Sequence, residues 1–180
     1  MSDETKSVFI DTNSFLHLRD LRDLPWGSMF PGEDAIDPMV ASAVIKELDK
    51  HKVGSNRRRR DRSRAALKMI DAASEEAGFA LILREAPVLI RLVIVDAERI
   101  EWSQFPKLDP SQPDDSLVAE AATHGSDAVI FSHDNGPRIS ARRLGLTAEA
   151  PPDDWLLPAE QTDDQRQMRA LERELEMARA

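Results

Sequence analysis

The chain contains no cysteine, and this absence excludes several kinds of site at once. Disulfide bonds, thiolate zinc centres, iron–sulfur clusters and cysteine nucleophiles all need that side chain. No apolar run approaches the roughly 18 residues of a membrane-spanning helix, and the N-terminal sequence MSDETK is not a signal peptide. There is no glycine-rich phosphate loop, which excludes nucleotide hydrolysis of the P-loop type. We therefore expect an intracellular, cytoplasmic protein.

The composition is that of a soluble globular protein with one concentrated basic segment. Of the 180 residues, 41% are hydrophobic and 32% are charged. A chain of about 150 residues or more buries roughly 70% of its unfolded surface, so its size does not require a structural metal. The net charge is −9, yet segment 57–64 (RRRRDRSR) holds six arginines and one aspartate. Such a patch can attract phosphate groups, because the local field matters more than the total charge.

Strand-like and helix-like segments alternate along most of the chain. The predicted strands are 7–10, 79–83, 88–95, 128–132 and 146–148, and the predicted helices are 41–52, 57–77, 113–125 and 137–144. Segments 79–83 and 88–95 form a predicted hairpin, and residues 21–37, rich in Pro, Gly and Asp, are predicted to be an irregular loop. This alternation predicts an α/β fold with a central, mainly parallel sheet flanked by helices.

Two regions divide the chain in this interpretation. Residues 1–150 form the main domain, and residues 151–180 form a linker and a C-terminal helix. In that helix the apolar residues Met168, Leu171, Leu175 and Ala178 have heptad-like spacing. Two heptads are too few for a coiled coil alone. We therefore expect the helix to dock on the body, on a second copy of the chain or on a partner protein.

Acidic residues stand at the ends of predicted strands and on neighbouring helices. Asp11 and Asp134 each follow an apolar strand, Glu47 flanks the apolar stripe of a helix, and Asp114 and Asp115 open another helix. Ligand sites in open parallel sheets lie outside the carboxyl ends of the strands. Two carboxylates 4 Å apart repel by about 4 kcal/mol at an effective dielectric constant of 20. A hard cation such as Mg²⁺ or Mn²⁺ would explain such a cluster. Alternatively, each acid only ends a strand or favours a helix dipole.

The two adjacent acids, Asp114 and Asp115, differ in their projection around the helix. Leu117, Val118 and Ala121 define the predicted buried stripe. At about 100° per residue, Asp114 lies within this stripe and Asp115 lies at its far edge. An acid on the core side needs a partner or a metal. We therefore favour Asp114 as the metal ligand and keep Asp115 as its neighbour.

Four short motifs, in this order, resemble the PIN-domain nucleases. They are Asp11-Thr12-Asn13, Val44-Ile45-Lys46-Glu47-Leu48-Asp49, Asp114-Asp115-Ser116-Leu117-Val118-Ala119-Glu120-Ala121 and Phe131-Ser132-His133-Asp134. The resemblance covers about residues 6–148, and the basic helix after Glu47 resembles that of the larger members. It implies a PIN-like three-layer fold and Mg²⁺- or Mn²⁺-dependent endonucleolytic cleavage of phosphodiester bonds, usually in single-stranded RNA, leaving a 5′-phosphate and a 3′-hydroxyl. The hairpin at 79–95 and the helix after residue 160 depart from the family pattern.

The resemblance also assigns roles to individual residues. The acidic positions that hold the metal and carry catalysis match Asp11, Glu47, Asp114 and Asp134, with Asn13, Ser132 and Asp115 as supporting residues. From their charge, we expect contacts to the phosphate backbone from Lys52, Arg57, Arg58, Arg59 and Arg60. The partner would then be single-stranded RNA, with DNA as the alternative.

Other interpretations remain open at this stage. A structure-selective DNA nuclease would use the same acids, and a catalytically idle PIN-like module would bind RNA or protein without cleavage. A haloacid-dehalogenase-like phosphotransferase would need an aspartate two residues after Asp11, where this chain has Asn13. Three tryptophans, Trp26, Trp102 and Trp155, lie among prolines and acids. Those surroundings favour packing over base stacking, which needs basic, exposed surroundings.

Overall fold

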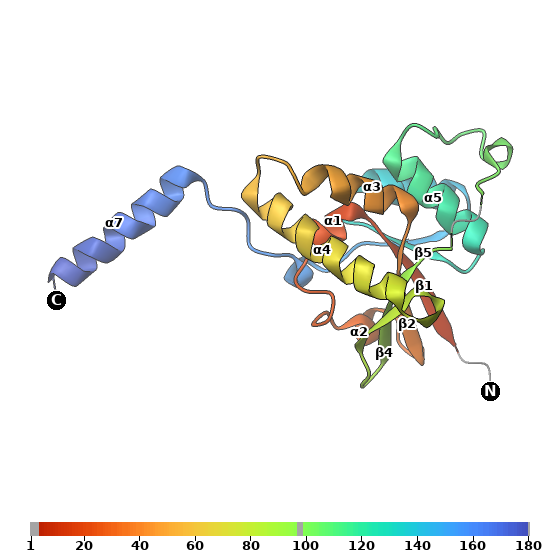
Figure 1. Cartoon of the computed structure of the whole chain (residues 1–180), viewed down its shortest axis with the longest axis horizontal. Coiled ribbons are helices and arrows are strands. Elements are labelled where there is room, and N and C mark those ends of the chain that lie inside the picture. The colour runs from red at the N-terminus through yellow and green to blue at the C-terminus, as the bar shows by residue number, and fades with distance from the viewer. Residues whose placement is uncertain (1–3, 97–98, 180) are drawn as a thin grey trace.

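A six-stranded sheet forms the centre of the computed structural model, which describes residues 4–96 and 99–179 (Figure 1). The strand order is β3-β4-β2-β1-β5-β6. All neighbours are parallel except β3 and β4, which are antiparallel. The strands are β1 (Thr5–Ile10), β2 (Ala35–Val40), β3 (Ala80–Arg84), β4 (Leu89–Ile94), β5 (Val129–Phe131) and β6 (Thr147–Glu149). The predicted α/β fold with a mainly parallel sheet is confirmed.

Helices flank this sheet, except for α7, which extends away from it. They are α1 (Thr12–His17), α2 (Trp26–Met29), α3 (Ser42–His51), α4 (Arg57–Glu75), α5 (Pro113–His124), α6 (Asn135–Arg143) and α7 (Asp163–Arg179). Helix α3 contacts α4 on one side and α5 on the other, and α5 contacts α6 (Figure 1). Proline at the first position of α5 and Gly125 after its last residue bound that helix as predicted.

The core is built on the innermost strands and on one aromatic cluster. Val8, Phe9 and Ile10 of β1 are completely buried, as expected for a strand covered on both faces. The rings of Trp26 and Trp155 lie 5.2 Å apart and both pack against Phe131. For these two tryptophans the predicted packing role is confirmed.

The prediction of an irregular loop over 21–37 is wrong, because it missed α2 and the start of β2. The sequence of β2, AIDPMV, contains an aspartate and a proline, which are both rare inside strands. In the structure Asp37 receives two hydrogen bonds from the Arg91 guanidinium, at 2.8 and 2.9 Å. The pairing between β2 and β4 skips Asp37 and Pro38, so the missing N–H of proline costs no ladder bond there. Burial raises the pKa of Asp37, and Arg91 partly offsets this effect.

Two further segments differ from their predicted roles. The hairpin of β3 and β4 is present, but β4 pairs in parallel with β2 and therefore belongs to the central sheet. The segment predicted as a linker between the main domain and the C-terminal helix contains a 3-10 helix (Asp153–Trp155) whose tryptophan is buried. The amide of Leu157 donates to the carbonyl of His17 at 2.7 Å, so the folded body reaches this residue. The surroundings of Trp155 predicted that it packs, but no periodicity around it in the sequence indicates which residues it packs against.

The predicted C-terminal helix is confirmed as α7, which extends away from the body (Figure 1). None of its described residues is buried, and Met168, Leu171 and Leu175 are 60%, 62% and 54% exposed. Across residues 4–96 and 99–179, every helix is too short or too polar to span a lipid bilayer.

Removal of α7 should leave the stability of the body unchanged, because this helix buries no residue against it. We expect a chain ending at residue 161 to melt within about 2 °C of the full chain, a shift that corresponds to less than about 1 kcal/mol. If α7 pairs with a second copy, light scattering will also show a smaller molar mass for the shortened chain. A large loss of melting temperature with no change in mass would show that α7 supports the body directly.

Candidate acidic site at the carboxyl ends of the strands

Asp11 is the buried acid of the site and lies directly after β1. It is the N-cap of α1 and is 5% exposed. One carboxylate oxygen accepts hydrogen bonds from the amide and the hydroxyl of Ser14, at 2.9 and 2.8 Å. The other oxygen accepts from the hydroxyl of Ser132. Burial raises the pKa of Asp11, while these three hydrogen bonds act in the opposite direction.

Ser132 links Asp11 to the next acid in space, Asp134. Ser132 follows β5 and is completely buried. Its hydroxyl oxygen, which donates to Asp11, also accepts from the amide of Asp134 at 3.1 Å. The amide nitrogen of Asn13 donates to the Asp134 carboxylate at 2.6 Å. The structure thus places both predicted supporting residues, Asn13 and Ser132, in contact with Asp134.

Glu47 and Asp114 approach the same region from the helices. Glu47 is partly exposed on α3, and Asp114 lies in the first turn of α5. The pKa of Asp114 is raised to about 6, first because the surrounding protein atoms restrict the hydration of its carboxylate, and second because Glu47, Asp11, Asp134 and Asp115 carry negative charge nearby. All four predicted acids therefore lie within electrostatic reach of one another through Asp114.

The two adjacent aspartates have different surroundings. Asp115 accepts a hydrogen bond from the amide of Asp109 at 2.9 Å and one from the hydroxyl of Ser140 at 3.5 Å. It therefore joins the preceding loop and α6 to α5. Within the described part of the chain, the carboxylate of Asp114 has no hydrogen-bond partner. Of the two adjacent aspartates, Asp114 is therefore the one whose oxygens remain available to a ligand.

The prediction that Asp114 projects into the buried stripe of α5 is wrong. The side chain is exposed, whereas the buried residues of the helix start only at Leu117. The first turn of α5 extends beyond the core. A side chain there can reach solvent even when it lies on the same face of the helix as Leu117. The preference for Asp114 over Asp115 therefore depends on its unbonded carboxylate and on its acidic neighbours.

The donor atoms of the site suit a hard divalent cation. All four acids offer carboxylate oxygens, and their mutual repulsion would be relieved by positive charge. Among residues 4–96 and 99–179, no three acidic or histidine side chains are close enough to form a ready-made metal cage. Mg²⁺ does not need one, because it usually keeps several waters and binds through one or two carboxylates.

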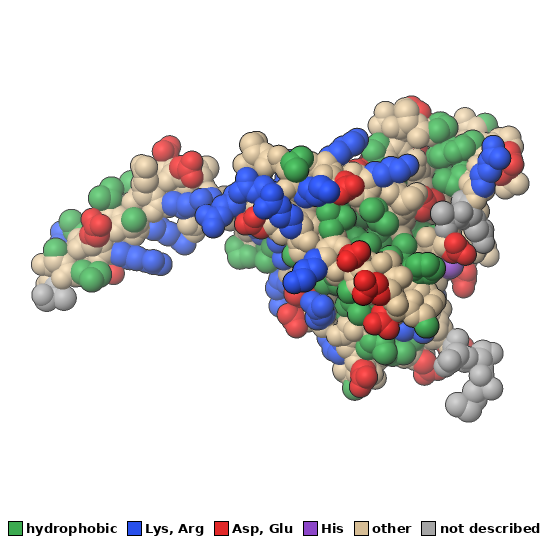
Figure 2. Space-filling model, viewed as in Figure 1, with side chains coloured by type: hydrophobic (Ala, Val, Ile, Leu, Met, Phe, Trp, Pro, Cys, Tyr) green, Lys and Arg blue, Asp and Glu red, His purple; other side chains and the backbone are tan. Residues whose placement is uncertain are grey.

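Basic side chains gather at the start of α4 (Figure 2). Burial lowers the pKa of His17, at the end of α1, and the charges of Arg59 and Arg58 lower it further. The charge of Asp134 acts in the opposite direction and raises the pKa of His17. His17 therefore lies within electrostatic reach of these arginines and of one acid of the site. Arg59 is exposed, and within the described part of the chain its guanidinium has no partner.

The other predicted phosphate-binding residues differ from Arg59. Lys52 is paired with Asp49 at 2.7 Å, and Arg58 donates to the carbonyl of Pro158 at 2.7 Å. Arg57 and Arg60 both lie near Asp61, at 3.7 and 3.9 Å. The side chain of Arg62 bonds the carbonyls of Phe15 and Leu18 and so fastens α4 to α1. Arg59 is therefore the most available of the group.

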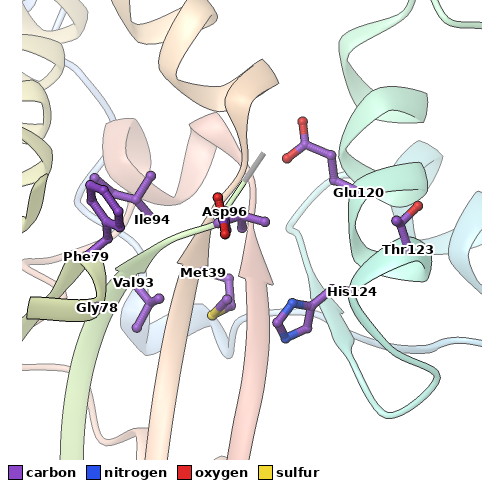
Figure 3. Close-up of a pocket in the computed structure, with 10 residues that line it drawn as sticks. Met39, Gly78, Phe79, Val93, Ile94, Asp96, Glu120, Thr123 and His124 are labelled. Atoms are coloured by element: carbon purple, nitrogen blue, oxygen red, sulfur yellow. The ribbon is translucent and has the colours of Figure 1, made fainter. Parts of the chain in front are cut away.

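Two pockets at this end of the sheet were not predicted. One, of about 450 Å³, lies between α5 and the ends of β2 and β4. Figure 3 shows Glu120 and His124 extending from α5 on one side of it and Phe79 and Val93 on the other. None of the four acids lines it. Glu120 accepts hydrogen bonds from the amide of Ser42, at 3.0 Å, and from its hydroxyl, and thereby fixes the first turn of α3.

The second pocket, of about 390 Å³, adjoins Glu47. Lys46 and Lys50 of α3 and Trp102 line it. Sequence patterns gave no signal for this pocket, because its aromatic and basic residues come from segments about 50 residues apart.

Comparison with known proteins gives a matching family model and several similar solved structures. The family model described as a PIN domain matches residues 8–151. No curated protein sequence matches the chain. One solved structure, described as a domain of a functionally unknown protein from Methanocaldococcus jannaschii DSM 2661, is similar at 15% identity with a TM-score of 0.48. The alignment covers 88% of this chain and 96% of that one.

The pKa of Asp114 leads to a prediction about metal-free stability. A folded-state pKa raised from 3.8 to about 6 favours folding when the group is protonated, and this benefit is lost as the pH rises through about 6. Asp114→Asn should therefore stabilise the chelator-treated protein at pH 7 and have no effect at pH 3.5. After allowance for solvent screening we expect on the order of 1 kcal/mol, or about 2–4 °C in a thermal melt.

Asp115→Asn is the matched control for this measurement. It alters the acceptor of hydrogen bonds from Asp109 and Ser140, so it should not stabilise the protein at either pH. Equal stabilisation by both variants at pH 7 would show that Asp114 has no special place among the acids.

Proposed function

The chain belongs to the PIN-domain family, and on that premise we propose that it is a metal-dependent endoribonuclease that hydrolyses phosphodiester bonds of single-stranded RNA. PIN domains are generally metal-dependent nucleases. The observation that carries the proposal is geometric: Ser132 joins Asp11 after β1 to Asp134 after β5, and Glu47 and Asp114 lie close enough for their charges to interact. A cluster of like charges at the carboxyl ends of parallel strands is expected where a cation and an anionic substrate meet.

In this proposal Mg²⁺ or Mn²⁺ would be held among Asp11, Glu47, Asp114 and Asp134, by one or two of them directly and by the others through its bound waters. The cation would neutralise charge on the phosphate and make water a better nucleophile, so no side-chain nucleophile is needed. The chain's own residues fix the acids. Ser14 and Ser132 hold Asp11, and Asn13 holds the Asp134 carboxylate, while no described residue bonds to either carboxylate oxygen of Asp114.

The arginines at the start of α4 would draw the substrate toward these acids. Arg58 and Arg59 lie close enough to His17 to lower its pKa, and the charge of Asp134 lies close enough to raise it. Positive charge at this distance from the acids suits a phosphate backbone that extends past the site. The choice of RNA over DNA follows from the family resemblance, since carboxylates do not distinguish ribose from deoxyribose.

Two further parts of the proposal concern partners and location. The exposed apolar residues of α7 offer a surface for a second copy of the chain or for another protein. A cytoplasmic location is expected for a cysteine-free chain of this kind.

The direct test is cleavage of labelled single-stranded RNA with Mn²⁺ or Mg²⁺, and with chelator. Asp11→Asn should lower the rate at least about a hundredfold, the size expected when a charge-stabilising group is lost. Asparagine can keep the bonds from Ser14, so the variant should melt like the wild type. The exposed Asp71 on α4 supplies the control Asp71→Asn, which should cleave normally.

Each other outcome supports a different function. Cleavage of branched or single-stranded DNA but not RNA would favour the DNA nuclease. Tight RNA binding without cleavage under any metal would favour an idle binding module. Wild-type cleavage rates in Asp11→Asn would remove Asp11 from the reaction.

The basic segment should affect binding more than chemistry. Arg59→Gln should weaken RNA affinity and reduce the slope of log K against log salt by about one unit, because one phosphate contact is lost. Lys68→Gln, also exposed on α4 but roughly 14 Å further along the helix at 1.5 Å per residue, should leave the slope unchanged. If Arg59→Gln and Lys68→Gln give the same salt slope, Arg59 does not contact a phosphate of the bound RNA.

A further inference from the structure

The pocket beside Glu47, which we call the α3–α5 pocket, continues the acidic site on one side. It has a volume of about 390 Å³, within the range of small-ligand sites. Its residues come from α3, from the segment before α5 and from the start of α5, and they include Lys46, Glu47, Lys50, Trp102, Ser111 and Pro113. Because Glu47 belongs to both, a ligand in the pocket would lie beside this acid.

Trp102 differs from the other two tryptophans of the chain. Trp26 and Trp155 are 0% and 1% exposed, whereas Trp102 is only partly buried, in the 3-10 helix Trp102–Gln104. Its sequence neighbours are acidic, which led to the prediction of a packing role. Its neighbours in the pocket include two lysines from α3. An accessible aromatic ring among basic groups is the combination that stacks the bases of single strands.

The two lysines are available to an anion. Lys46 and Lys50 are one helical turn apart, so they share a face of α3. Both are exposed, and neither forms an ion pair with another described residue. Of the two acids in the pocket, Glu120 is bonded to Ser42 and Glu47 is part of the acidic site. The pocket therefore retains uncommitted positive charge beside an aromatic ring.

We propose that the α3–α5 pocket binds one nucleotide of a single-stranded substrate, with its base on Trp102 and a neighbouring phosphate on Lys46 and Lys50. This inference rests on the proposed nuclease function. Helix α3 lies between α4 and α5, so the pocket and the arginines at the start of α4 are on opposite sides of it (Figure 1). A strand that contacts both would pass Glu47, which lines the pocket. A duplex has no unstacked base to offer and does not fill the pocket.

Tryptophan fluorescence can report binding in this pocket, because Trp26 and Trp155 are buried and a ligand can stack only on Trp102. We expect a mixed-sequence single-stranded RNA oligonucleotide, added with chelator to prevent cleavage, to quench the emission. A duplex of the same sequence should not. Trp102→Phe should lose the quenching yet still bind, since phenylalanine also stacks. Trp102→Ala should weaken binding by about tenfold, because stacking contributes about 1–3 kcal/mol per base.

The lysines are tested by the salt dependence of the same binding. Lys46→Gln with Lys50→Gln should lower the slope of log K against log salt by between one and two units, and Lys68→Gln should not change it. If the wild type binds or cleaves RNA and Trp102→Ala behaves identically, the pocket is not part of the substrate path and only this inference fails. If the wild type neither binds nor cleaves any nucleic acid, the proposed function fails, and the inference fails with it.

Discussion

The hydroxyl of Ser132 joins the ends of two neighbouring parallel strands, and the arrangement of the acids depends on it. It donates to the buried carboxylate of Asp11 after β1 and accepts from the amide of Asp134 after β5. A buried carboxylate is stable only when its oxygens are hydrogen-bonded, and Ser14 supplies the remaining donors. These bonds fix the distance between two acids that would otherwise separate. They also ensure that α1 and α6 both begin at the site.

This fixed pair of acids explains the electrostatics of its surroundings. Glu120 anchors the first turn of α3 through Ser42, and α3 carries Glu47 toward the pair. Asp114 then meets negative charge from several directions, which contributes to a pKa of about 6. Asp115 is instead used to hold α5 against α6 and the preceding loop. A divalent cation would relieve the repulsion, and basic residues on two sides of α3 would compensate for it toward a polyanion.

The sequence predicted the parts of this structure that depend on local pattern. Strands β1 and β5 are continuous apolar runs, and α5 is bounded by proline and glycine, so all three were predicted. The strand β2 was missed, because an aspartate and a proline indicate a turn until the distant Arg91 pairs with Asp37. The burial of Trp155 and the pocket around Trp102 depend on partners far along the chain. The four acids were named from the sequence, but only three-dimensional placement distinguishes Asp114 from Asp115.

The central claim is that these acids bind one shared cation. The most direct measurement is the Mn²⁺ affinity, by calorimetry, of the wild type, Asp114→Asn, Asp134→Asn and the double variant. If the ion is shared, each single change weakens binding about tenfold or more, and the effects are not additive, as for residues that contact one ligand. Mn²⁺ affinities that match the wild type in both single variants would contradict the account.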